Sequence, residues 1–171
     1  MQKTIALLFF VGMATFVCGQ ENDKPTSSFT ISGEVKTPLT IQLNDLKKWT
    51  AAPIPDMIIT NHLGEKKSEA KGMKGVLLKD ILGTVEIKAE SPRVLSEYYF
   101  VCKANDGYTV VYSWNELFNT ATGDATYIVT EKDGQPAATR NDTFLMVSAK
   151  DFKTGRRHLK SLMSIEVKRA Q

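Results

Sequence analysis

The residues with the clearest capacity for chemistry are the basic side chains of the stretch Arg140–Lys160. An apolar run, Phe144–Val147, has the character of a buried strand, and the loop after it contains a single acid, Asp151. The basic residues of this loop are Lys150, Lys153, Arg156, Arg157, His158 and Lys160. Because arginine offers a planar fork of donors and lysine a compact positive charge, such a loop suits phosphate or sulfate. A solvated basic loop is the simpler alternative, and charge alone leaves both open.

Other kinds of active site find little support among the side chains. The two histidines, His62 and His158, lie in separate loops without the spacing of a zinc or copper site, and no Cys-x-x-Cys pair is present. We therefore expect no metal ligated by protein side chains and assign no catalytic residue. A serine hydrolase would need a Gly-x-Ser-x-Gly turn, which is absent. Cys102 lies in an apolar run that disfavours its thiolate.

The start of the chain has the pattern of a secretory signal. Lys3 supplies a positive charge, and the apolar run Ile5–Val17 is shorter than the roughly 20 residues that a membrane helix needs. Small Gly19 allows cleavage after it, so residues 1–19 are predicted to be a signal peptide. We expect the protein to be exported, either periplasmic or secreted. Acylation of Cys18 would instead give a lipoprotein, which bulky residues before the cysteine disfavour.

The rest of the chain has the size of one domain with its own core. The polar residues 20–28 predict a disordered leader, and the domain is expected over residues 29–169. The 171 residues carry a formal net charge of +3, too small to indicate binding to nucleic acid or to a membrane surface. No apolar run in the domain approaches a membrane span. Without the signal only Cys102 remains, so no intramolecular disulfide is possible.

Alternation of apolar and polar residues predicts short strands over much of the domain. We expect strands near residues 29–32, 39–43, 57–60, 94–103, 109–112, 127–130, 144–147 and 165–167, and short helices near 44–49, 75–83 and 113–119. A Ser113–Glu116 capping box opens the last helix, and the turn at 105–107 predicts a hairpin. This is a single α+β domain, rich in mixed and antiparallel sheet, with a few short helices. A Rossmann or P-loop fold is excluded because no glycine-rich phosphate loop stands in a βαβ unit.

An ordered set of motifs resembles the sulfite-oxidase-type molybdopterin-binding domain family. The matching stretches are Ile31–Leu46, Gly75–Leu82, Asp106–Tyr108, Asp133–Pro136 and Gly155–Lys160. The first stretch resembles that family's opening strand and Leu-x-x-Leu helix, and the second resembles its Gly-Val-x-Leu-x-x-Leu-Leu helix. The third and fourth resemble its Asp-Gly-Tyr and Asp-Gly-x-Pro turns, and the fifth resembles its phosphate loop. The resemblance runs from about Phe29 to Lys168, nearly all of the expected domain.

The resemblance implies a β-rich α+β fold and a molybdopterin-type cofactor whose phosphate contacts the last motif. The cofactor-binding candidates that it implies are Asn61, His62, Tyr108, Arg140, Arg156, Arg157, His158 and Lys160. Lys160 keeps the lysine of the family pattern. Leu145 stands where the family has a phosphate-binding arginine, and Arg140 is a candidate substitute from another position.

The family also ligates molybdenum through a cysteine in the loop before the Gly-Val helix. The corresponding loop here, Asn61–Lys71, contains no cysteine. An imidazole or an amide is a poor substitute for a charged, soft thiolate. A standard molybdenum site is therefore doubtful.

Three functions follow from these observations. The one we favour is an exported domain that binds a small anionic ligand or a pterin phosphate without standard molybdenum catalysis. The second is an active molybdopterin-dependent oxidoreductase, and the third is an interaction or structural domain with an empty pocket. A nucleic-acid partner is not expected, and no protein partner is indicated.

Overall fold

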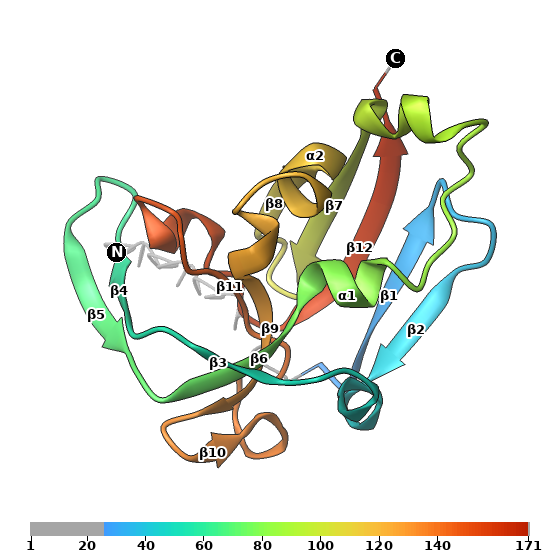
Figure 1. Cartoon of the computed structure of the whole chain (residues 1–171). Helices are drawn as coiled ribbons and strands as arrows, with labels where there is room; N and C mark the ends of the chain where they lie inside the picture. Colours follow the sequence, from blue (N-terminus) through green and yellow to red (C-terminus); the bar gives the residue numbers. More distant parts are fainter. Residues whose placement is uncertain (1–25, 171) are drawn as a thin grey trace, which may run out of the picture.

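The computed structural model describes residues 26–170. The expected signal peptide and most of the expected leader lie outside this range. Within it, the chain forms two five-stranded sheets and a separate two-stranded ribbon, joined by short helices (Figure 1). No helix among the described residues is both long enough and apolar enough to cross a bilayer.

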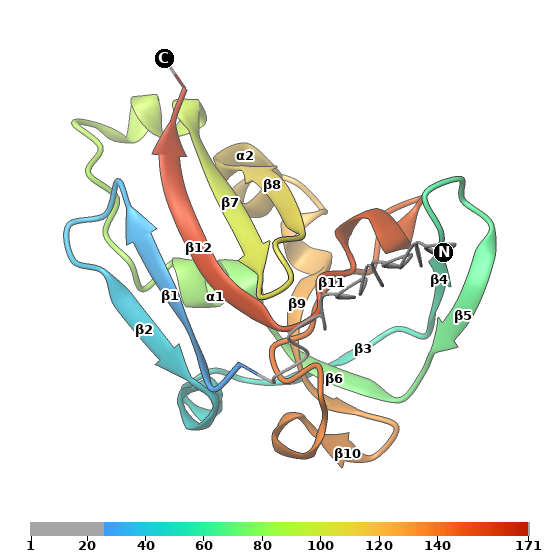
Figure 2. The ribbon, with the colours of Figure 1, turned by 180° about the vertical axis from the view of Figure 1, so that it is seen from behind.

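The first sheet has the strand order β2-β1-β12-β7-β8. Its strands are β1 (Ser28–Gly33), β2 (Leu39–Gln42), β7 (Tyr98–Ala104), β8 (Thr109–Ser113) and β12 (Leu162–Arg169). The pair β1 and β12 is parallel, and the other neighbours are antiparallel. The sheet therefore joins the first and last strands of the described chain, and β12 lies at its centre (Figure 2).

The second sheet has the order β10-β9-β6-β3, and β11 also pairs with β9. Its strands are β3 (Ala52–Ile54), β6 (Met73–Leu77), β9 (Thr126–Lys132), β10 (Gln135–Pro136) and β11 (Met146–Ser148). The ribbon consists of β4 (Met57–Thr60) and β5 (Lys66–Ala70), which form an antiparallel pair at one end of the molecule (Figure 1).

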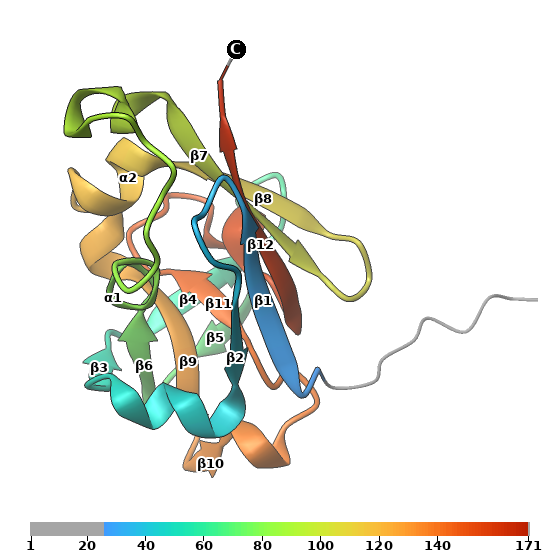
Figure 3. The ribbon, with the colours of Figure 1, turned by 90° about the vertical axis from the view of Figure 1, so that its right-hand side faces the viewer.

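Two short α-helices cover one face of the first sheet (Figure 3). They are α1 (Leu78–Leu82) and α2 (Trp114–Phe118). The 3-10 helices are η1 (Leu43–Lys48), η2 (Pro92–Glu97), η3 (Gly123–Ala125), η4 (Ala137–Thr139) and η5 (Thr154–Arg157). The predicted capping box is present in α2: the Ser113 hydroxyl accepts from the Glu116 N–H at 3.1 Å, and the Glu116 carboxylate accepts from the Ser113 N–H at 2.8 Å.

The main core lies between the first sheet and these helices. Alternate residues of the strands point into it, among them Phe29 and Ile31 of β1, which are almost fully buried. Phe29 meets Phe144 edge to face, with ring centroids 5.1 Å apart. A smaller cluster lies between the second sheet and the ribbon, around Leu145 and Val129. Leu145 thus belongs to the core, and its side chain is unavailable to a ligand.

The predicted α+β class, rich in mixed and antiparallel sheet, is confirmed. Several element boundaries were wrong. Residues 75–77 belong to β6 and only 78–82 are helical, because apolar residues in an unbroken run satisfy either conformation. The strand expected from residue 94 begins at Tyr98, after the helix η2. The strand β5 was missed because four of its five residues are exposed, so it lacks an apolar pattern.

Candidate functional site

The basic segment after β11 docks on strand β4 through a threonine and a glycine. The Thr154 hydroxyl donates to the Ile58 carbonyl oxygen at 2.5 Å and accepts from the Thr60 N–H at 3.1 Å. At Gly155, a Cβ atom would lie 1.7 Å from the Thr60 carbonyl oxygen. Only glycine fits at this distance. The Thr-Gly pair therefore fixes where the helix η5 lies.

Arg156 ties two further loops to η5. Its Nη2 donates to the carbonyl oxygen of His62, in the β4–β5 loop, at 3.0 Å. Its own carbonyl oxygen accepts from the hydroxyl of Tyr108, just after the β7–β8 turn, at 2.7 Å. We call this meeting of three loops, defined by His62, Tyr108 and Arg156, the three-loop junction. It brings together three of the predicted cofactor-binding residues.

Asn61 and Lys153 border the junction in different ways. The Asn61 Oδ1 accepts from the N–H groups of Leu63 and Glu65 at 2.9 and 3.0 Å, and its Nδ2 donates to the Glu65 carboxylate at 2.8 Å. The Asn61 amide is thus used within its own turn. A Cβ atom at Gly64 would lie 3.4–3.8 Å from three carbons of the Lys153 side chain, so that side chain runs beside the β4–β5 loop.

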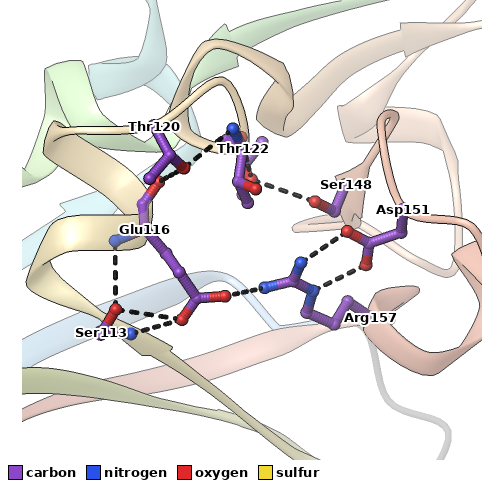
Figure 4. Close-up of polar contacts among 8 residues, drawn as sticks. Ser113, Glu116, Thr120, Thr122, Ser148, Asp151 and Arg157 are labelled. Atoms are coloured by element: carbon purple, nitrogen blue, oxygen red, sulfur yellow. Dashed lines mark hydrogen bonds and ion pairs between the residues drawn. The ribbon is translucent and has the colours of Figure 1, made fainter.

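Arg157 is less exposed than its neighbour Arg156, and its guanidinium points toward Asp151 and Glu116 (Figure 4). Its Nε and Nη2 donate to the two carboxylate oxygens of Asp151 at 2.6 and 2.5 Å, and its Nη1 donates to Glu116 at 3.0 Å. Its guanidinium carbon lies 4.5 Å from the centroid of the Tyr112 ring. The bonds to Asp151 hold the pKa of Arg157 above its ordinary value, and burial only partly opposes them. Two carboxylates, the mostly buried Asp151 and the partly exposed Glu116, compensate this charge.

Glu116 has two functions in this contact. One of its oxygens caps the start of α2 through Ser113, and the other pairs with Arg157 (Figure 4). The helix α2 and the basic segment are therefore linked through one carboxylate. We call the set Glu116, Arg157 and Asp151 the carboxylate clamp, because it fixes the segment on the side opposite β4.

Arg140 lies in another place, buried beneath the β9–β10 region. Its side chain is 6% exposed, and its Nε lies 3.0 Å from the Asp142 carboxylate. Its Nη2 makes a long hydrogen bond of 3.4 Å to the Val129 carbonyl oxygen. Within residues 26–170, the buried Nη1 has no hydrogen-bond partner. Arg140 thus does not take the position of an exposed phosphate ligand.

His158 and Lys160 lie on the same side as Arg140. Burial, followed by the charges of Lys160 and Lys132, lowers the pKa of His158 to about 4, while Asp142 opposes this shift. His158 is therefore a neutral imidazole at pH 7 and adds no positive charge for an anion. Lys160 is exposed and forms no ion pair with any residue of the described range.

A cavity of about 320 Å³ lies beside Lys160. Its lining consists of Asn105, Asp106, Asn141, Asp142, Lys160 and Ser161. The Asp106 carboxylate accepts from the Tyr108 N–H at 2.8 Å, so this cavity adjoins the three-loop junction through one turn. The predicted site residues thus lie in three places: around the junction, around Arg140 together with His158 and the exposed Lys160, and in the clamp with Arg157.

The donor atoms near the junction do not fit a thiolate-ligated metal. Cys102 is fully buried in β7, and burial raises the pKa of its thiol to about 12. In the Asn61–Lys71 loop, the Asn61 amide is already hydrogen-bonded within its own turn, and the His62 imidazole is exposed. Among residues 26–170, no three His, Cys, Asp or Glu side chains gather as a metal site would require. We therefore derive no reaction through molybdenum.

Sequence reasoning did not identify the carboxylate clamp. Asp151 stood out as the single acid of the basic loop, and Glu116 as part of a capping box. Their convergence on Arg157 depends on where the fold places α2 relative to the basic segment, for which the sequence has no local pattern. The single acid in a basic loop, Asp151, was the one sequence feature that could have indicated an internal ion pair.

No family model matches the chain, and no curated protein sequence matches it. Among solved structures, the sulfane dehydrogenase SoxCD from Paracoccus pantotrophus is similar, with a TM-score of 0.57 and 12% sequence identity. The match covers 82% of this chain and 37% of that chain, so the present chain spans well under half the length of its neighbour. At this identity the likeness shows a distant relationship of fold.

Proposed function

We propose that this domain binds a small anionic ligand, a pterin phosphate or a simpler phosphate compound, at the three-loop junction without thiolate-ligated molybdenum. The distant fold likeness to a sulfane dehydrogenase and the family-like motifs of the sequence support an origin among molybdopterin-binding domains. The apolar start of the sequence supports export, so we propose that the domain works in the periplasm or outside the cell.

The main support for this proposal is that the basic segment around η5 is held in place while two of its positive charges have no acidic partner among the described residues. Arg156 and Lys153 are exposed and have no carboxylate partner within residues 26–170. The segment that carries them is held on one side by Thr154 and Gly155 and on the other by the clamp. Such preorganisation lowers the entropy lost when an anion binds.

Tyr108 gives the junction an aromatic surface suited to a planar ring. Its hydroxyl is held by the Arg156 carbonyl oxygen, while its side chain remains 43% exposed. A tethered ring can stack on a heterocycle without losing much conformational freedom. A ligand that combines a flat ring with a phosphate therefore matches the junction better than a simple inorganic anion does.

Isothermal titration calorimetry tests the proposal by measuring the dissociation constants of inorganic phosphate and of pterin-6-carboxylate. Arg156→Ala and Lys153→Ala should each weaken binding about tenfold, as expected for the loss of one charge-assisted contact. Arg93→Ala and Lys47→Ala are the matched controls, because both residues are exposed and lie outside the junction. Unchanged binding in both junction variants would refute the site.

Elemental analysis separates this proposal from the oxidoreductase alternative. The protein should be exported from a host that makes molybdopterin and then purified. We expect far less than stoichiometric molybdenum, because the loop at Asn61 has no thiolate. One molybdenum atom per protein molecule would instead support the hypothesis of an active molybdopterin-dependent oxidoreductase.

A further inference from the structure

Two large apolar side chains are exposed at the same end of the molecule. Phe152 is fully exposed, with a relative accessibility of 102%, and Leu63 is 62% exposed. They are the two most exposed of the large apolar side chains in the described range. A fully exposed phenylalanine beside a second exposed apolar residue forms a small apolar patch, and its significance depends on the charges around it.

The fold holds Phe152 outward. The residue before it, Asp151, is bound to the guanidinium of Arg157. Two residues after it, the Thr154 hydroxyl is bound to the Ile58 carbonyl oxygen on β4. Because the chain is anchored on both sides, Phe152 occupies the apex of a fixed turn.

Leu63 is held in a similar way at the apex of the β4–β5 loop. Its N–H donates to the Asn61 side chain, and the N–H of Gly64 donates to the Asn61 carbonyl oxygen at 3.1 Å. Gly64 supplies a positive φ of 97° for this turn. The Lys153 side chain packs along Gly64, so the two apexes are neighbours. Figures 1 and 2 show this loop and the segment before η5 together at one end.

The Phe152 segment has three positive charges without an ion-pair partner in the described range, whereas the Leu63 loop contains one acid, Glu65, which accepts from the Asn61 amide. Lys150, Lys153 and Arg156 are exposed and form no ion pair with another described residue. The one acid of the segment, Asp151, is neutralised by Arg157. The small net charge of the chain concealed this local excess. We call the group Phe152, Leu63, Lys150, Lys153 and Arg156 the basic apolar tip.

We propose that the basic apolar tip docks on the surface of an anionic lipid bilayer. Phe152 and Leu63 enter the boundary between headgroups and acyl chains, and the three cations face the headgroup phosphates. A bilayer fits better than a soluble ligand because Phe152 stands free of any protein wall that could enclose one. The lipid surrounds a protruding side chain from every direction. The two proposals share Lys153 and Arg156, so Phe152 and Leu63, which take no part in holding the junction ligand, are the residues that distinguish them.

Co-sedimentation of the mature protein with vesicles tests the proposal. One set of vesicles contains phosphatidylcholine alone, and the other contains phosphatidylglycerol as a third of its lipid. Binding should require the anionic lipid and should weaken with added salt. Phe152→Ala should lower the partition coefficient about tenfold, and Lys153→Gln about fivefold.

Matched controls lie elsewhere on the surface. Val111→Ala removes an apolar side chain that is 51% exposed on β8, and Lys47→Gln removes an exposed charge on η1. Both should bind vesicles like the unaltered protein. Phe152→Ala should still bind inorganic phosphate if the junction does, so failure of one proposal is visible without the other. Glycerol 1-phosphate should not displace the protein from vesicles, because it lacks the acyl region that Phe152 enters.

Three results would overturn the proposal. The first is absence of binding to anionic vesicles, and the second is equal binding by the unaltered protein and Phe152→Ala. The third is a dimer in sedimentation velocity that Phe152→Ala converts to a monomer, which would assign the tip to a second copy of the chain.

Discussion

Arg157 and Asp151 form a bidentate ion pair, with Nε and Nη2 of the guanidinium 2.6 and 2.5 Å from the two carboxylate oxygens. Both side chains are mostly buried, at 20% and 12% exposure. The next residue along the chain from Asp151 is the fully exposed Phe152, and the residue before Arg157 is the exposed Arg156. One inward ion pair therefore orients two outward side chains, and the two proposals depend on its rigidity.

Removal of Arg157 should destabilise the fold. Arg157→Ala leaves Asp151 and one oxygen of Glu116 without their partner, and such a loss costs about 2–3 kcal/mol of unfolding free energy for a pair that is mostly buried. Urea unfolding measures this change. Arg169→Ala is the control, since Arg169 pairs with Glu90 and Glu97 at the surface and should cost less than about 1 kcal/mol. Equal losses in the two variants would contradict the clamp.

Substitution of Gly155 should displace η5 from β4. A Cβ atom would lie 1.7 Å from the Thr60 carbonyl oxygen, and both groups are backbone, so neither can move alone. Gly155→Ala should cost about 3 kcal/mol or more and weaken phosphate binding at the junction. Gly83→Ala is the comparison, because Gly83 has a φ of −64° and its nearest contact would be 3.2 Å. It should change stability by less than about 1 kcal/mol.

The sequence predicted the strands well where burial alternates along the chain. In β1 the burial of Phe29 and Ile31 follows the period of two that identified the strand. The pattern failed at Gly75, where a Cβ would lie 2.7 Å from the Ile128 carbonyl oxygen across the sheet. That close approach to β9 is a tertiary feature, and the apolar run alone fits a helix equally well.

The basic segment could be located from the sequence, but which of its side chains are exposed and which are paired internally could not be predicted. Arg156 and Arg157 are neighbours in sequence and identical in chemistry, yet one is exposed at the junction and the other is paired with Asp151. Their different orientations depend on the Glu116 carboxylate and the His62 carbonyl oxygen, which belong to other segments. The role of each arginine is set by contacts between segments far apart in the chain.

His158 should make the folded state sensitive to mild acid. Its pKa in the fold is lowered from 6.5 to about 4, chiefly by burial. The unfolded chain therefore binds more protons between these values, so stability is retained above pH 6.5 and lost as the pH falls toward 4. Since Gln carries no charge, His158→Gln should lose less stability over this window, by roughly 1–3 kcal/mol.

Urea unfolding at neutral and mildly acidic pH measures that difference. The carboxylates titrate in both proteins, so their contribution cancels in the comparison. His62→Gln, a substitution of an exposed histidine in the β4–β5 loop, is the control and should follow the unaltered protein. If the profile of His158→Gln also follows it, His158 is not the group responsible.

Cys102 should resist thiol reagents in the folded protein. It is fully buried between β12 and β8, and burial raises the pKa of its thiol to about 12, so the reactive thiolate is scarce at pH 8. A chain without residues 1–19 should therefore react with Ellman's reagent only as fast as it unfolds, and fully in guanidinium chloride. Arg157→Ala should speed the reaction, because its lower stability raises the unfolded fraction, whereas Arg169→Ala should not. Rapid native-state labelling would show that the thiolate is accessible and would contradict the burial of Cys102.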